Sequence, residues 1–103
     1  SDRQNVAEIL KVHDALVTNT SAQDVLAAET RRRDLLVQAL EVANLRYEAG
    51  RTSYLEVLDA QRTLLASQTL RIQAARDARI SIVDFAKSLG GGWTPERFDV
   101  VTY

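Results

Sequence analysis

The first half of the chain lacks the residues that end helices, since neither proline nor glycine occurs between Asp2 and Glu48. Ala, Leu, Val, Glu, Arg and Gln dominate this stretch, and most of them favour helix. We therefore predict one helix over about 3–48, a length typical of a coiled coil rather than of a globular domain. The four short polar residues Thr18–Ser21 compete for backbone hydrogen bonds and mark the place where a kink or break could interrupt it.

A helix stop and a helix start follow each other closely in the middle of the chain. Gly50 predicts the stop, because glycine adopts the left-handed conformation at a helix end without a steric penalty. Ser53 and Glu56 form the S-x-x-E pattern of a capping box, in which each side chain accepts a hydrogen bond from the other residue's backbone N–H. So short a connection forces two long helices to lie side by side and antiparallel.

The second helix is predicted over 53–89, where Gly90-Gly91-Gly92 ends it and Pro95 prevents its resumption. The expected fold is therefore all-α, a long antiparallel two-helix coiled-coil hairpin in one unit, 1–103. Its parts are the first helix within 1–49, a tip turn at 50–52, the second helix, and a Gly-rich exit with an irregular tail at 90–103.

Both predicted helices carry more apolar surface than one partner helix can cover. In the second helix, small residues that permit close approach recur at every seventh position: Ala60, Ser67, Ala74, Ser81 and Ser88. On the neighbouring face of the same helix, a second seven-residue series is mostly large and apolar: Leu58, Leu65, Ile72, Arg79 and Ala86. The first helix also has two stripes, one with Leu36, Leu40, Ala43 and Tyr47, the other with Val25, Ala28, Leu35, Ala39 and Val42. A solitary hairpin buries one stripe per helix, so the other predicts packing against further helices, or dimerisation of the hairpin alone.

Composition narrows the function classes. The 103 residues form one domain at most, and a net charge of -1 gives no basic face for a nucleic acid. The chain has no cysteine for a disulfide or thiolate metal site, and no apolar run reaches the roughly 18 to 20 residues that cross a bilayer as a helix. Because it opens at Ser1 without an initiator Met, we interpret it as a processed chain or an excised piece of a longer one.

Three features that could suggest a chemical site have simpler structural explanations. The glycine run at 90–92 follows a helix, whereas a phosphate-binding loop precedes one. His13 is the only histidine and has no second ligand at a metal-binding spacing. The arginines at 31–33 spread round a helix between acidic residues, as on a solvated coiled-coil face. We expect no metal, no cofactor and no enzymatic activity, since two helices offer no pocket of convergent polar groups.

Polar and apolar side chains gather just behind the predicted turn. Glu56 and Asp59 share a helix face, as an acid–base pair would, although the helix dipole also favours carboxylates at this end. Arg62 follows Asp59 by one turn, Leu55 precedes it by one turn, and Tyr47 lies across the hairpin. The spacing leaves a structural salt bridge and a functional contact equally open.

Three sequence blocks frame the hairpin: Leu45-Arg46-Tyr47-Glu48-Ala49-Gly50, Tyr54-Leu55-Glu56-Val57-Leu58-Asp59-Ala60-Gln61-Arg62, and Leu89-Gly90-Gly91-Gly92-Trp93. In this order and spacing they resemble the C-terminal repeat of TolC-type outer-membrane efflux channels, in the branch paired with resistance-nodulation-division pumps. R-Y-x-x-G alone is weakly specific, but the three blocks together cover nearly the whole chain. The resemblance implies one hairpin of the periplasmic helical tunnel of a homotrimer, in the outer membrane of a Gram-negative bacterium.

The resemblance also implies partners and roles. The channel would export drugs, metals or other solutes with a periplasmic adaptor protein and an inner-membrane resistance-nodulation-division transporter. The tip that touches the adaptor would comprise Gly50, Arg51, Thr52 and Ser53. The gate would comprise Leu55 as the apolar constriction, Asp59 as the acidic ring, Tyr47 and Arg62 in the polar network that closes the tip, and Glu56 at a second position that is acidic in some relatives.

Two other interaction modules share this helical pattern. A hairpin of the periplasmic adaptor would be flanked by β-rich, lipoyl-like sequence, and the L-G-G-G-W block argues against it. A soluble coiled-coil scaffold without a transport role is the second alternative. As given, the chain is expected to form part of a channel and not a channel by itself.

Overall fold

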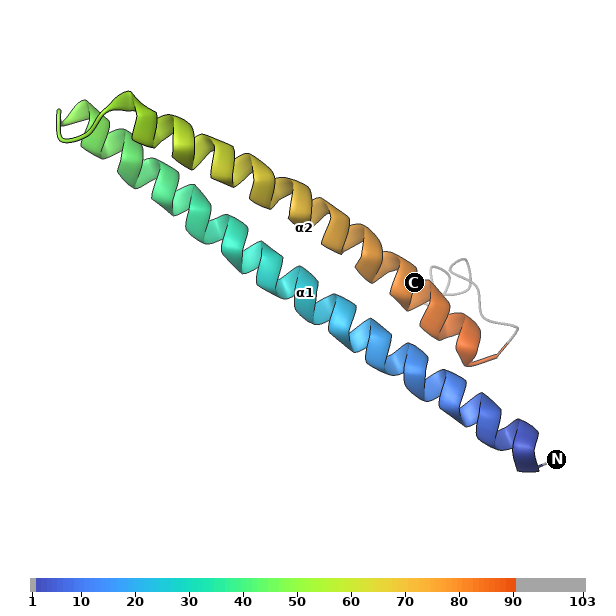
Figure 1. Ribbon diagram of the computed structural model, residues 1–103. Helices are drawn as coiled ribbons and strands as arrows, with labels where there is room; N and C mark the ends of the chain where they lie inside the picture. The colour runs from blue at the N-terminus through green and yellow to red at the C-terminus, as the bar shows by residue number, and fades with distance from the viewer. Residues whose placement is uncertain (1, 91–103) are drawn as a thin grey trace, which may run out of the picture. The chain divides into compact units, whose positions relative to one another are not determined.

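The computed structural model describes residues 2–90, which form helix α1 (Asp2–Glu48) and helix α2 (Tyr54–Ser88) (Figure 1). The expected all-α helical hairpin is confirmed, and no strand occurs within residues 2–90. Helix α2 ends one residue before the predicted Leu89. The predictions for Gly91, Gly92, Trp93 and Pro95, and for the rest of the tail, lie outside the described residues.

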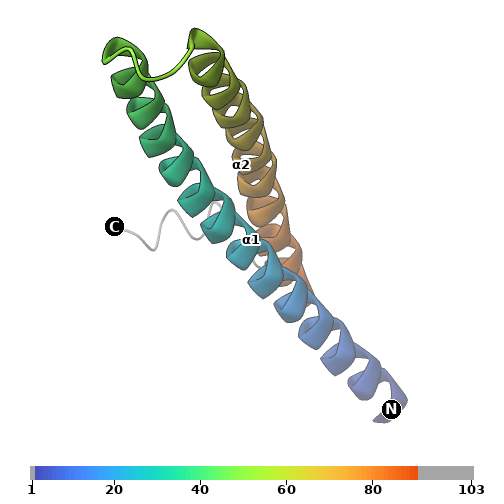
Figure 2. The same ribbon diagram turned by 60° about the vertical axis from the view of Figure 1, so that its left-hand side comes forward.

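The chain divides into two compact units, each built from a segment of α1 and a segment of α2. The turn unit is Val25–Ala75, and the described part of the end unit combines residues 2–24 with residues 76–90. Within each unit the two segments lie side by side and run antiparallel, as the views in Figures 1 and 2 agree.

The seam between the helices of the turn unit follows the alternating three- and four-residue spacing of a coiled coil. On α2 the inward series is Val57, Ala60, Leu64, Ser67, Arg71 and Ala74, and on α1 it is Leu26, Glu29, Arg33, Leu36, Leu40 and Ala43. Val57 is 1% exposed and Ser67 0%. The small residues of α2 are among the inward ones, so the predicted close approach is confirmed in this unit.

In the end unit, hydrogen bonds join the two segments. The Ser81 hydroxyl lies 3.0 Å from Asn19 Oδ1, while Gln23 Nε2 donates to Asn19 Oδ1 and to the Ala78 carbonyl, each at 3.2 Å. Helix α1 runs through Thr18–Ser21 without the break that the polar run allowed. The Asn19 side chain bonds across to α2 and therefore does not compete for the backbone of its own helix.

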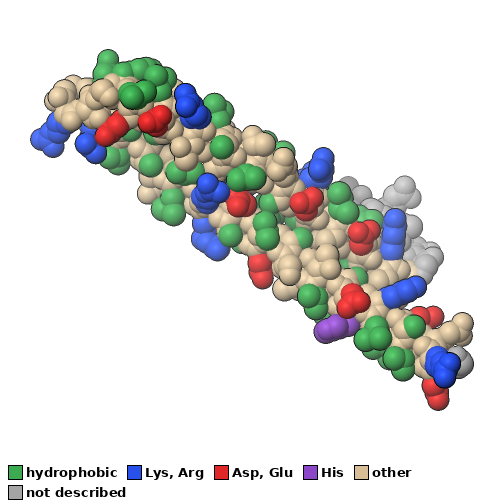
Figure 3. All heavy atoms as spheres, viewed as in Figure 1, with side chains coloured by type: hydrophobic (Ala, Val, Ile, Leu, Met, Phe, Trp, Pro, Cys, Tyr) green, Lys and Arg blue, Asp and Glu red, His purple; other side chains and the backbone are tan. Residues whose placement is uncertain are grey.

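The second apolar stripe of each helix stays exposed. In the turn unit Leu35 is 65% exposed, Leu65 63% and Ile72 61%. On the face seen in Figure 3, hydrophobic side chains lie uncovered between charged ones. Ala86 of the end unit departs from the expectation, because it is buried at 5% exposure. The hairpin otherwise covers one stripe per helix, as the sequence predicts.

The close approach of the helices makes Ala74 sensitive to added volume. Ala74 is 5% exposed, so Ala74→Leu overpacks the seam and should lower the free energy of unfolding by about 1–3 kcal/mol. Ala66→Leu is the matched control on the exposed side of α2 and should change it by less than about 0.5 kcal/mol. Urea unfolding followed by circular dichroism measures both. Equal losses in the two variants would contradict the packing described.

Candidate tip and gate

Helix α1 ends in a Schellman motif centred on Gly50. Gly50 has φ +72°, its N–H donates to the Tyr47 carbonyl, and the Arg51 N–H donates to the Arg46 carbonyl, both at 2.9 Å. These two bonds satisfy carbonyls that the helix end would otherwise leave free. The predicted glycine stop is therefore confirmed.

The start of α2 differs from the predicted capping box. The Glu56 N–H donates to the Ser53 backbone carbonyl at 3.2 Å, and a Glu56 carboxylate oxygen lies 3.9 Å from Arg46 Nη1. The Glu56 side chain thus faces α1, and the predicted return to the Ser53 N–H is wrong. The guanidinium across the turn offers a full positive charge, whereas Ser53 offers a single neutral donor.

An aromatic pair also joins the two sides of the turn. The Tyr47 and Tyr54 rings lie edge to face, with centroids 5.1 Å apart and planes at 68°. Both side chains are only half covered. Neither Arg46 nor Tyr54 was predicted as a site residue, although their places directly on either side of the turn were the signal that could have revealed them.

Leu55, Asp59 and Arg62 lie on α2 just behind the turn and share one face, because they are four and then three residues apart. All three are exposed, Leu55 at 63%. No ion pair joins Asp59 to Arg62 within residues 2–90, and the Asp59 backbone carbonyl accepts a hydrogen bond from Thr63 Oγ1 at 2.9 Å. The structural salt bridge that the spacing left open is therefore not formed in the hairpin.

The structure brings some of the predicted gate residues together and leaves others apart. Tyr47 packs against Tyr54, and Glu56 forms an ion pair with Arg46. Within residues 2–90 no ion pair or hydrogen bond joins Tyr47 or Glu56 to the side chains of Asp59 or Arg62. In the predicted adaptor-contact turn, Gly50, Arg51 and Ser53 are exposed and Thr52 is half-buried.

Residues 2–90 contain no group of three or more His, Cys, Asp or Glu side chains placed to hold a metal ion. Neither described helix combines the length and apolarity needed to cross a membrane. An open hollow in the end unit is lined by residues that include Glu8, Lys11 and Lys87, and none of the predicted site residues lines it.

The left-handed glycine should make the turn sensitive to Gly50→Ala. No atom lies within 4 Å of the added Cβ, so the cost is backbone strain alone, and we expect a loss of about 1 kcal/mol in the free energy of unfolding. Gly50→Asn should lose less, because asparagine tolerates this conformation better than alanine. Thermal unfolding of both variants gives the comparison, and an equal loss would argue against strain at φ as the cause.

The aromatic pair should contribute more to the turn than the ion pair beside it. Tyr54→Leu removes the edge-to-face contact and should cost about 0.5–1.5 kcal/mol, whereas Tyr54→Phe keeps both rings and should be nearly neutral. Arg46→Ala should cost less than about 1 kcal/mol, since both members of its pair with Glu56 are about half exposed. The ranking is checked by urea unfolding, and a larger loss in Arg46→Ala than in Tyr54→Leu would reverse it.

Comparison with known proteins finds relatives among outer-membrane efflux proteins. The chain is 34% identical over 98 residues to outer membrane protein OprJ of Pseudomonas aeruginosa, which covers 95% of this chain and 19% of OprJ. It is 35% identical over 83 residues to the cation efflux system protein CusC of Escherichia coli O6:H1, covering 81% of the chain and 18% of CusC. It is 37% identical over 84 residues to the solvent efflux pump outer membrane protein SrpC of Pseudomonas putida, covering 82% of the chain and 18% of SrpC.

No family model and no solved structure matches the chain. The chain spans only 18–19% of the length of these relatives, while they cover four-fifths or more of the chain. The similarity includes the turn and both helices, since OprJ matches over 95% of the chain. This chain therefore belongs to the TolC-type family of outer-membrane efflux proteins and corresponds to one segment of its members.

Proposed function

We propose that this chain is one helical hairpin of the periplasmic tunnel of a homotrimeric outer-membrane efflux channel, and that its turn at 50–52 lies at the periplasmic tip. The full-length protein conducts solutes outward and works with a periplasmic adaptor and an inner-membrane resistance-nodulation-division transporter. It is a passage and not an enzyme. The names of relatives support this proposal, since CusC is a cation efflux system protein and SrpC belongs to a solvent efflux pump.

The observation that carries the proposal is the exposed face of Leu55, Asp59 and Arg62 beside the turn. An apolar, an acidic and a basic side chain share this face. Within residues 2–90 no ion pair involves the Asp59 carboxylate or the Arg62 guanidinium. Their charges are available to partners outside the hairpin.

In the proposed trimer, the face of Leu55, Asp59 and Arg62 in each hairpin points toward the threefold axis, and the three faces together form the gate. Three Asp59 carboxylates around one axis repel each other unless cations or hydroxyl donors compensate their charge. Arg62 and Tyr47 of the neighbouring hairpins supply that compensation, Leu55 narrows the passage, and Glu56 adds a second acidic position. Opening exchanges these contacts for others.

The turn gives the adaptor a place to bias this exchange. Gly50, Arg51 and Ser53 are exposed, so a protein that binds them more tightly in the dilated tip shifts the population toward the open state without any chemistry. The exposed stripes that include Leu35, Leu65 and Ile72 support packing of the hairpin among further helices of a tunnel wall.

The gate is tested in the full-length trimer with Asp59→Ala combined with Arg62→Ala. Removing both charges removes the contacts that hold the tip closed, so the single-channel ion conductance in planar bilayers should rise severalfold. Unchanged conductance would exclude the gating role.

A matched control removes the same charges elsewhere on α2. Asp77 and Arg79 are exposed and lie in the end unit, so Asp77→Ala with Arg79→Ala should leave the conductance as in the unmodified trimer. A similar rise in this control would show that loss of charged side chains anywhere along α2, and not at the tip in particular, raises the conductance.

A further inference from the structure

The seam of the turn unit loses its apolar side chains partway along its length. On α1 the residues between Leu26 and Leu36 that face α2 are Glu29 and Arg33. On α2 the next residue after Ser67 that faces α1 is Arg71. Apolar contact therefore contributes least to closing the helices at this level. Another interaction must hold the section together.

Three atoms in this section are buried without a hydrogen-bond partner: Glu29 Oε2, Ser67 Oγ and Arg71 Nε. A buried polar group without a partner destabilises a fold, and a charged one does so most. Glu29 forms an ion pair with Arg32 Nη1 on its own helix, at 3.9 Å, and the Arg32 side chain is 52% exposed. Such an exposed local pair is weak and leaves the Arg71 atom without a partner.

The register of the hairpin brings Glu29 and Arg71 to the same level. Tyr47 meets Tyr54, and Arg46 meets Glu56, across the turn. Followed residue for residue along the antiparallel helices, these contacts place Glu29 level with residues 72 and 73. Arg71 and Ala74 are the residues directly on either side of that level that face α1.

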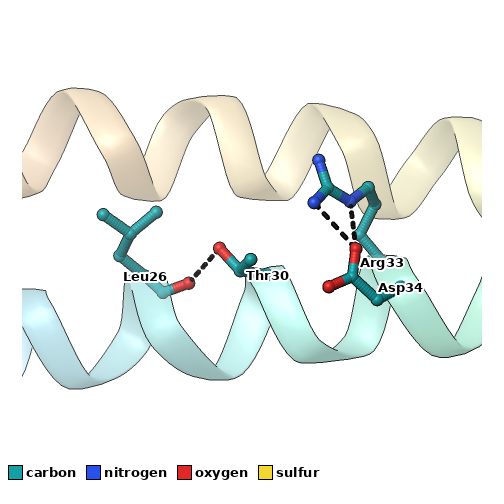
Figure 4. Close-up of polar contacts among 4 residues, drawn as sticks. All are labelled: Leu26, Thr30, Arg33 and Asp34. Atoms are coloured by element: carbon teal, nitrogen blue, oxygen red, sulfur yellow. Dashed lines mark hydrogen bonds and ion pairs between the residues drawn. The ribbon is translucent and has the colours of Figure 1, made fainter.

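Two other polar side chains of α1 near this level, Thr30 and Arg33, are already engaged (Figure 4). Arg33 donates from Nε to Asp34 Oδ1 at 2.9 Å, and its Nη2 lies 2.7 Å from the same oxygen. Thr30 Oγ1 donates to the Leu26 carbonyl of its own helix at 2.8 Å. Asp34 thus compensates the Arg33 charge, and Glu29 is left as the complement of Arg71.

Glu29 and Arg71 make no direct ion pair in the structure of residues 2–90. We propose that one bridging water joins the two side chains into a charge pair across the helices, and that this pair holds the polar section of the seam closed with the Ser67 hydroxyl as a further partner. A carboxylate oxygen accepts, Arg71 Nε donates, and the serine hydroxyl can do either. The pair belongs to the seam inside the hairpin and is independent of the proposed gate on the exposed face.

Double-mutant cycles in the 103-residue chain test the pair. Glu29→Gln and Arg71→Met each remove one charge at nearly constant volume and leave the other buried, so each should lower the equilibrium constant for folding by about tenfold or more. The double variant should lose far less than the product of the two single losses. Urea unfolding gives the constants.

The matched control cycle combines Glu29→Gln with Arg32→Met. The Glu29–Arg32 contact is local and exposed. The loss in the folding equilibrium constant of the double variant should therefore equal the product of the two single losses to within about twofold. Independent losses for Glu29 and Arg71, or coupling of Glu29 to Arg32 as strong as to Arg71, would overturn the proposal.

A second measurement uses the unmodified chain and so does not depend on a variant that folds. The Arg71 Nε–H should exchange with solvent at least tenfold more slowly than the Arg32 Nε–H in nitrogen-15 NMR spectra, since it is buried and bonded. Glu29→Gln should abolish that difference. Equal exchange rates in the unmodified chain would overturn the proposal, as would protection of Arg71 that persists in Glu29→Gln.

Discussion

The close approach of two helices along a seam of small residues is the constraint on which the other features depend. Ser67, Ala74 and Ala78 are almost fully buried, and their short side chains leave little apolar area at the interface. Hydrophobic burial per residue is therefore modest, so the polar contacts of the seam and the turn matter more than in a globular core. Asn19, Gln23 and Ser81 provide such contacts in the end unit.

The same constraint explains why so much apolar surface remains outside. A thin seam accommodates one stripe from each helix, and large side chains such as Leu35, Leu65 and Ile72 lie beyond it. A hairpin with this surface suits a wall of packed helices better than a solitary existence in water. The similarity to outer-membrane efflux proteins fits the proposed place of the hairpin in a tunnel wall.

Under the proposed function, the charges that stay unpaired within the hairpin are the ones that act in the gate. Glu56 is compensated by Arg46 across the turn, and Arg33 by Asp34 beside it. Asp59 and Arg62 share the exposed face without an ion pair in the described residues. Under the proposed function, assembly and not folding completes their contacts, which is a physical basis for a gate that opens by exchanging partners.

The sequence alone determined the two helices, the glycine stop and the small-residue seam, because helix propensity, left-handed backbone at Gly50 and seven-residue periodicity are local properties. Its motifs also indicated the family and the face of Leu55, Asp59 and Arg62. The tertiary structure decided which of two neighbouring stripes is buried, that Glu56 meets Arg46, that Tyr47 meets Tyr54, and that Asn19 bonds to α2 without breaking α1. These outcomes depend on distances between residues far apart in the chain, which periodicity and propensity do not specify.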